Sequence, residues 1–116
     1  MYDELYSKFK EQGYDDVYCI SVNDAFVMNA WARDLDIKNV VMIPDGCGTF
    51  TRSMGMLVNK PAQGFGMRSW RYACVINNSI VEKWFEEPGI NNEGLDDDPY
   101  VESTPKNVVD YLRSCK

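Results

Sequence analysis

The stretch GFGMRSWRYACVINNSIVEKWF, residues 64–85, predicts a β-hairpin and so decides how the second half of the chain folds. From residue 71 onward, two apolar runs flank the pair Asn77-Asn78. Asparagine tolerates positive φ angles, and this pair therefore favours a tight turn between two antiparallel strands. We expect the hairpin to span residues 71–85.

Two arginines, Arg68 and Arg71, stand just before the apolar run 72–76. A permanently charged group buried without a partner is costly. One interpretation is structural, with both arginines at strand ends and paired with acids such as Asp24 or Glu82. The other is functional, with the guanidinium groups binding an anionic or polar ligand. The residues alone leave both interpretations open.

The rest of the chain alternates between predicted helices and strands. We expect a helix over 2–13, a strand over 16–22, a helix over 21–35, a strand over 39–46, a short helix over 48–56, loops over 59–66 and 86–99, and a last helix over 104–114. The last helix has Thr104 as its N-cap and Pro105 at its first position. This order predicts a mixed-sheet α/β domain over residues 1–116, and it resembles a thioredoxin-like fold from that fold's first helix onward.

Composition excludes several classes of protein. The 116 residues carry a net charge of -6, which argues against nucleic acid or an anionic membrane surface as a partner. No apolar run approaches the ~20 residues that span a bilayer, and we expect a cytoplasmic protein. There is no histidine, so catalysis by a Ser-His or Cys-His pair is excluded. We expect no metal site and no cofactor.

The four cysteines are scattered, with no C-x-x-C pair. Cys19 and Cys74 fall inside predicted strands, where cysteine behaves as a small core residue. Cys47 lies in a turn and Cys115 near the C-terminus, so both are expected to be exposed. None stands at the start of a predicted helix, where a thiol of low pKa is typically found.

A resemblance to a known family lies in four stretches. They are SVNDAFVMNAWA (21–32), PDGCGTFTRSMGMLVNK (44–60), GFGMRSWRYACVI (64–76) and VEKWFEEPG (81–89). In these stretches the chain resembles the type V (atypical, plant type II-like) peroxiredoxins, especially the bacterial peroxiredoxin–glutaredoxin fusion proteins. The resemblance implies a homodimeric thiol peroxidase that needs no cofactor. It would reduce hydrogen peroxide and alkyl hydroperoxides, with glutathione, glutaredoxin or thioredoxin as reductant.

The resemblance also implies roles for the two arginines. Arg71 would hydrogen-bond the peroxide oxygens and stabilise the reactive thiolate, which suits a planar and permanently charged donor group. Arg68 would support the same pocket near the dimer edge. Phe26, Phe65 and Trp70 are candidate aromatic anchors for the dimer face.

The sequence departs from this family at its beginning. The family's reactive cysteine lies in a P-x-x-x-T-x-x-C motif, and no Pro, Thr or Cys precedes Tyr14. By resemblance, the chain lacks the N-terminal strands and the start of the first helix, so we expect two half-sheets without a ladder between them. We expect this chain alone to be inactive. The alternatives are a catalytically dead thioredoxin-like binding or dimerisation module, or a redox sensor that uses Cys47 or Cys115.

Overall fold

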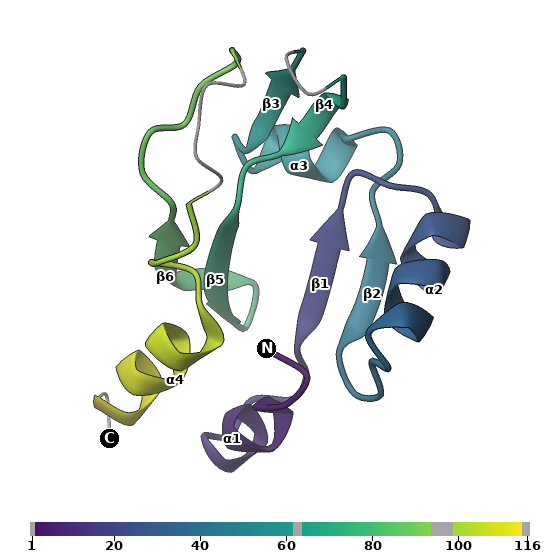
Figure 1. The fold of residues 1–116 in the computed structure, drawn as a ribbon. Helices are drawn as coiled ribbons and strands as arrows, with labels where there is room; N and C mark the ends of the chain where they lie inside the picture. The colour runs from purple at the N-terminus through teal and green to yellow at the C-terminus, as the bar shows by residue number, and fades with distance from the viewer. Residues whose placement is uncertain (1, 62–63, 94–98, 115–116) are drawn as a thin grey trace.

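The computed structural model describes residues 2–61, 64–93 and 99–114 (Figure 1). The elements in chain order are α1 (Tyr6–Glu11), β1 (Tyr18–Ser21), α2 (Ala25–Asp34), β2 (Val41–Pro44), α3 (Thr49–Ser53), β3 (Leu57–Lys60), β4 (Gly66–Ser69), β5 (Tyr72–Asn77), β6 (Ile80–Glu86) and α4 (Pro105–Ser114). The predicted alternation of helices and strands is confirmed, with one hairpin added.

A βαβ unit forms the first half of the molecule. Strands β1 and β2 pair in parallel, from Tyr18 opposite Val41 to Ser21 opposite Pro44. Parallel neighbours need a crossover connection, and α2 supplies it. This helix begins at Asp24, whose Oδ1 accepts a hydrogen bond of 2.8 Å from the Val27 amide.

The hairpin predicted from residues 71–85 is β5–β6, with Tyr72 opposite Glu86 and Asn77 opposite Ile80. Its turn consists of Asn78 and Ser79, which have φ angles of 52° and 67°. Positive φ at both central residues is the signature of a type I′ turn, whose twist matches that of the strands. The turn thus lies one residue later than Asn77-Asn78, although the hairpin itself is confirmed.

The loop predicted over 59–66 is wrong at both ends. Strand β3 includes Asn59 and Lys60, and β4 starts at Gly66, so that the two strands form a second antiparallel hairpin. The glycines and the proline of this segment are typical of a loop, and they led to a loop prediction although two strands of four residues each are present. Packing stabilises the hairpin, because Val58 is buried with Trp70 in a small cluster.

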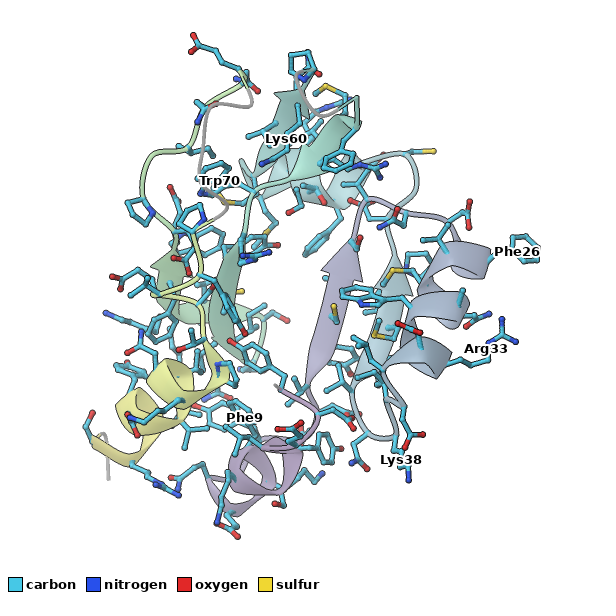
Figure 2. The ribbon with its side chains drawn as sticks, in the orientation of Figure 1. Phe9, Phe26, Arg33, Lys38, Lys60 and Trp70 are labelled. Atoms are coloured by element: carbon cyan, nitrogen blue, oxygen red, sulfur yellow. The ribbon has the colours of Figure 1, made fainter. Side chains whose placement is uncertain are left out.

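The main core lies between α1, β5, β6 and α4. Its buried members are Phe9, Val75, Phe85, Val108, Val109 and Leu112. Three of these residues come from α4, and complete burial of such a side chain stabilises a fold by about 1.5–3 kcal/mol. Figure 2 shows Phe9 reaching from α1 toward α4. The core therefore fastens the last helix onto the β5–β6 hairpin.

The two halves of the molecule share no strand ladder in the described part of the chain. There, β1 pairs with β2 and β5 pairs with β6 in separate sheets, as predicted, while β3 and β4 form a third two-stranded sheet. Residues next to the N-terminus connect the halves instead. The Tyr2 hydroxyl donates to the Ser103 carbonyl on the α4 side, while the Asp3 carboxylate accepts from the Asn39 and Val40 amides at 2.8 and 3.0 Å.

None of the described helices has both the length and the apolar character that crossing a bilayer requires. Within residues 2–61, 64–93 and 99–114, no three His, Cys, Asp or Glu side chains gather closely enough to bind a metal ion.

Candidate functional site

Arg71 lies between β4 and β5 with its side chain exposed. Its Nη1 donates a hydrogen bond of 3.2 Å to the Pro99 carbonyl, and its guanidinium carbon lies 4.9 Å from the centre of the Tyr100 ring. A guanidinium stacked on an aromatic face is stabilised by the ring quadrupole. The carbonyl and the ring together orient the Arg71 side chain at the start of the hairpin.

Arg68 lies on β4 and is half-buried. Its Nη1 donates to the Val22 carbonyl at 2.5 Å and to Asn23 Oδ1 at 3.1 Å, and its guanidinium carbon lies 5.9 Å from the centre of the Phe65 ring. These contacts join the β3–β4 hairpin to the loop that precedes α2. The structure thus gives Arg68 neutral oxygen partners where the structural interpretation expected acids.

A third charged residue, Glu87, lies beside Arg71 and was not singled out from the sequence. Its side chain is fully buried, with 0% of its surface exposed. One carboxylate oxygen accepts from the Val101 and Glu102 amides at 2.8 and 3.1 Å, and the other accepts from the Ser103 amide and hydroxyl at 2.7 and 2.6 Å. Desolvation raises the pKa of this carboxyl, but the four hydrogen bonds outweigh it and lower the pKa to about 2.

The backbone of Glu87 connects this carboxylate to the arginine. The Glu87 amide donates to the Arg71 carbonyl at 3.2 Å, and the Glu87 carbonyl accepts from Trp70 Nε1 at 2.7 Å. Trp70 is therefore a core residue, 2% exposed, and the expectation that it anchors a dimer face is wrong. The other two candidate anchors are exposed, Phe26 by 85% and Phe65 by 54%, and Figure 2 shows Phe26 pointing away from α2.

The cysteines differ in their surroundings. Cys19 and Cys74 are half-buried, and burial raises the pKa of both thiols. Neither has the lowered pKa that a thiolate nucleophile requires. Cys47 is exposed, as predicted from its turn. Cys115 lies outside the described residues.

Comparison with known proteins shows the family of this chain. A family model described as Redoxin matches residues 1–102. A peroxiredoxin of Rhizobium etli is 57% identical over 113 residues, which cover 97% of this chain and 63% of that protein. The hybrid peroxiredoxin hyPrx5 of Haemophilus influenzae is 50% identical over 111 residues, which cover 96% of this chain and 44% of that protein.

Solved structures agree. One described as the X-ray structure of a peroxiredoxin superposes with a TM-score of 0.91 at 42% identity, covering 97% of this chain and 65% of that one. The Plasmodium falciparum antioxidant protein, a 1-Cys peroxiredoxin, gives a TM-score of 0.91 at 41% identity, covering 97% of this chain and 64% of that one. The fold is thus thioredoxin-like α/β, as predicted. The chain belongs to the redoxin family, and it spans 63% and 44% of the two relatives named above.

Proposed function

We propose that this chain forms part of a thiol-dependent peroxidase of the peroxiredoxin type, which reduces hydrogen peroxide and alkyl hydroperoxides. A cysteine thiolate attacks one peroxide oxygen, so that an S–O bond forms while the O–O bond breaks. The sulfur is oxidised by two electrons to a sulfenic acid, and the departing oxygen takes a proton to become water or an alcohol. Two reductant thiols then return the sulfur to the thiol and are themselves oxidised to a disulfide, and the sulfenic oxygen leaves as water.

The observation that carries this proposal is the setting of Arg71. Its guanidinium is exposed at the start of β5 and is oriented by the Pro99 carbonyl and the Tyr100 ring. A planar, permanently charged donor suits the negative charge that develops on the departing peroxide oxygen. We assign Arg71 to peroxide and thiolate stabilisation. Arg68 acts in support by fixing β4 against the loop before α2.

The proposal assigns the attacking thiol to polypeptide other than these 116 residues. The sequence contains no P-x-x-x-T-x-x-C motif, and the thiols of Cys19 and Cys74 have raised pKa values. The chain on its own is therefore expected not to turn over peroxide. Its relatives' greater length supports this assignment.

The proposed reductant is glutathione, glutaredoxin or thioredoxin. We further propose that the peroxidase is a homodimer and works in the cytoplasm. The resemblance to peroxiredoxin–glutaredoxin fusions favours the first two reductants, and the likeness to a hybrid peroxiredoxin is consistent with it. The exposed rings of Phe26 and Phe65 support a dimer face beside the start of α2.

The test is peroxide consumption with glutathione and glutaredoxin supplied, by the 116-residue chain and by a longer protein that includes its upstream coding sequence. We expect turnover by the longer protein and none by the chain alone. In the longer protein, Arg71→Lys should lower kcat/KM by roughly 10- to 100-fold. The matched control Arg33→Lys, an exposed arginine on the outer side of α2 (Figure 2), should leave kcat/KM unchanged.

Two results would contradict this proposal. Turnover by the 116-residue chain that disappears in Arg71→Lys would show that one of its own cysteines attacks the peroxide. A folded longer protein that consumes no peroxide would exclude the peroxidase function. The separate half-sheets favour one other candidate for that case, a catalytically dead module that dimerises or accepts a strand from a partner. Analytical ultracentrifugation of the chain, alone and with a candidate strand-donating partner, would detect such a dimer or complex.

A further inference from the structure

The segment that leads into α4 runs past the β5–β6 hairpin (Figure 1), and it contacts Arg71, the residue just before β5. We call residues 99–104 the strap. At one end of the strap, the Pro99 carbonyl and the Tyr100 ring contact the Arg71 guanidinium. At the other end, Thr104 starts α4, its Oγ1 accepting from the Asn107 amide at 3.2 Å. Between these ends, the strap is bound by the Glu87 carboxylate.

The Glu87 carboxylate is the centre of this arrangement. Three consecutive amides, those of residues 101–103, point at its two oxygens, and the Ser103 hydroxyl adds a fourth hydrogen bond. Charge-assisted hydrogen bonds of this kind are stronger than neutral ones. The same residue binds the hairpin through its backbone, because its amide donates to the Arg71 carbonyl. Glu87 thus fixes the strap relative to the arginine's own backbone.

We propose that Glu87 is a positioning residue for Arg71: by holding the strap, it sets the direction in which the guanidinium presents its donors. The inference deepens the proposed function and rests on it for its catalytic consequence. An exposed arginine has many rotamers, and two contacts that orient this one, with the Pro99 carbonyl and the Tyr100 ring, come from the strap. Without a charged acceptor for amides 101–103, the strap loses its contacts with Glu87 and keeps those that Tyr2 and Asn107 make with the Ser103 and Glu102 carbonyls. Tyr100 and Pro99 then hold the guanidinium less firmly.

Glutamine is the informative substitution, because Glu87→Gln keeps the shape and one carbonyl acceptor. It replaces the other acceptor with an NH₂ group that faces donors already present at Ser103 or at 101–102. Asp3 supplies the matched control, because its carboxylate binds backbone amides in a similar way elsewhere in the chain. Asp3 also accepts from three consecutive amides, those of residues 38–40, and its clamp lies on the β2 side of the molecule.

The first measurement is NMR of the 15N-labelled chain, with the Arg71 Nε–Hε signal assigned from an Arg71→Lys spectrum. In Glu87→Gln, amides 101–103 should lose hydrogen-exchange protection at least about tenfold, or ~1.4 kcal/mol. The Arg71 signal should shift and lose its contacts to the Tyr100 ring. The Arg68 signal should stay in place. In Asp3→Asn, protection should fall at residues 38–40, with the Arg71 signal unchanged.

The second measurement is catalytic and uses the longer protein. Glu87→Gln should lower kcat/KM for peroxide, and this effect should vanish in an Arg71→Lys background because Glu87 acts through the arginine. The NMR result stands without turnover, so an inactive wild-type protein would refute the proposed function alone.

An Arg71 signal that is unmoved while amides 101–103 lose protection would overturn the inference. So would an undiminished effect of Glu87→Gln on kcat/KM in the Arg71→Lys background. Should Glu87→Gln fail to fold, Ser103→Ala removes only the 2.6 Å hydroxyl bond and allows the same comparison. The Arg71 signal is then expected to shift from its wild-type position with weaker contacts to the Tyr100 ring, and an unmoved signal refutes the inference.

Discussion

Replacing Glu87 by glutamine should destabilise the protein at neutral pH, because the folded state binds the ionised carboxyl tightly. Its pKa is about 2 in the folded protein against an ordinary value of 4.5. Each unit of pKa difference corresponds to about 1.4 kcal/mol, so a shift of this size contributes on the order of 3 kcal/mol. The side chain is fully buried, with 0% exposed, and little of this contribution is screened by solvent.

The sign follows from which state holds the proton more tightly. A folded pKa below the unfolded one means that stabilisation is complete above pH 4.5 and is lost as the pH falls through about 2. The pH dependence of this stabilisation is measured by urea unfolding of wild type and Glu87→Gln. Unfolding is followed by tryptophan fluorescence at several pH values between 7 and 2. The difference in unfolding free energy should be about 2–3 kcal/mol at pH 7. It should decline steadily below pH 4.5.

A difference that stays constant from pH 7 to pH 2 would refute this reasoning, because the loss would then come from packing and not from charge. Glu11→Gln is the control, since Glu11 is exposed at the end of α1. Its effect should stay within about 0.5 kcal/mol at every pH, as for most surface substitutions. Comparing the two variants separates the buried carboxylate from the general response of an acidic chain to pH.

Three further predictions concern stability and thiol reactivity. Ser79→Gly should stabilise the protein by about 0.5–1 kcal/mol in thermal unfolding, because Ser79 has a φ of 67°; a loss would show that the serine side chain matters more than the turn. In the native chain, iodoacetamide should modify Cys47 well before Cys19 and Cys74, because only Cys47 of these three is exposed, and peptide mass mapping would reveal the opposite order. Leu112→Ala should cost about 2–5 kcal/mol in urea unfolding, since Leu112 is 4% exposed in the main core, and a cost below 1 kcal/mol would mean that α4 packs loosely.

Local signals predicted the elements whose causes are local. Residues 71–85 form the expected hairpin because two apolar runs flank residues that accept positive φ. The last helix begins as expected, with Thr104 as its cap and Pro105 at its first position. The cap and the turn each depend on residues within three or four positions of one another, so composition and spacing suffice to find them.

Features that depend on distant contacts were missed. The β3–β4 hairpin forms in a glycine-rich segment because Val58 packs against Trp70. Trp70 was expected at the surface, yet its indole donates to the Glu87 carbonyl, 17 positions away. Glu87 itself lies where a polar, acidic loop was predicted, and no local pattern distinguishes it from Glu93, an exposed acid of the same loop. Its four donors come from residues 14 to 16 positions later in the chain.

The same distinction explains Arg71. The residue type and its place at a strand start are local, and they sufficed to single it out as a candidate. Its direction is not local, because the Pro99 carbonyl that accepts from it lies 28 positions away. A guanidinium holds its five N–H donors in one rigid plane, so fixing one donor on a carbonyl and one face on a ring fixes where the whole fork points. The strap supplies both constraints, and Glu87 and the start of α4 hold the strap. The packing of α4 in the core is therefore connected, through these contacts, to the orientation of a charge at the opposite end of the strap.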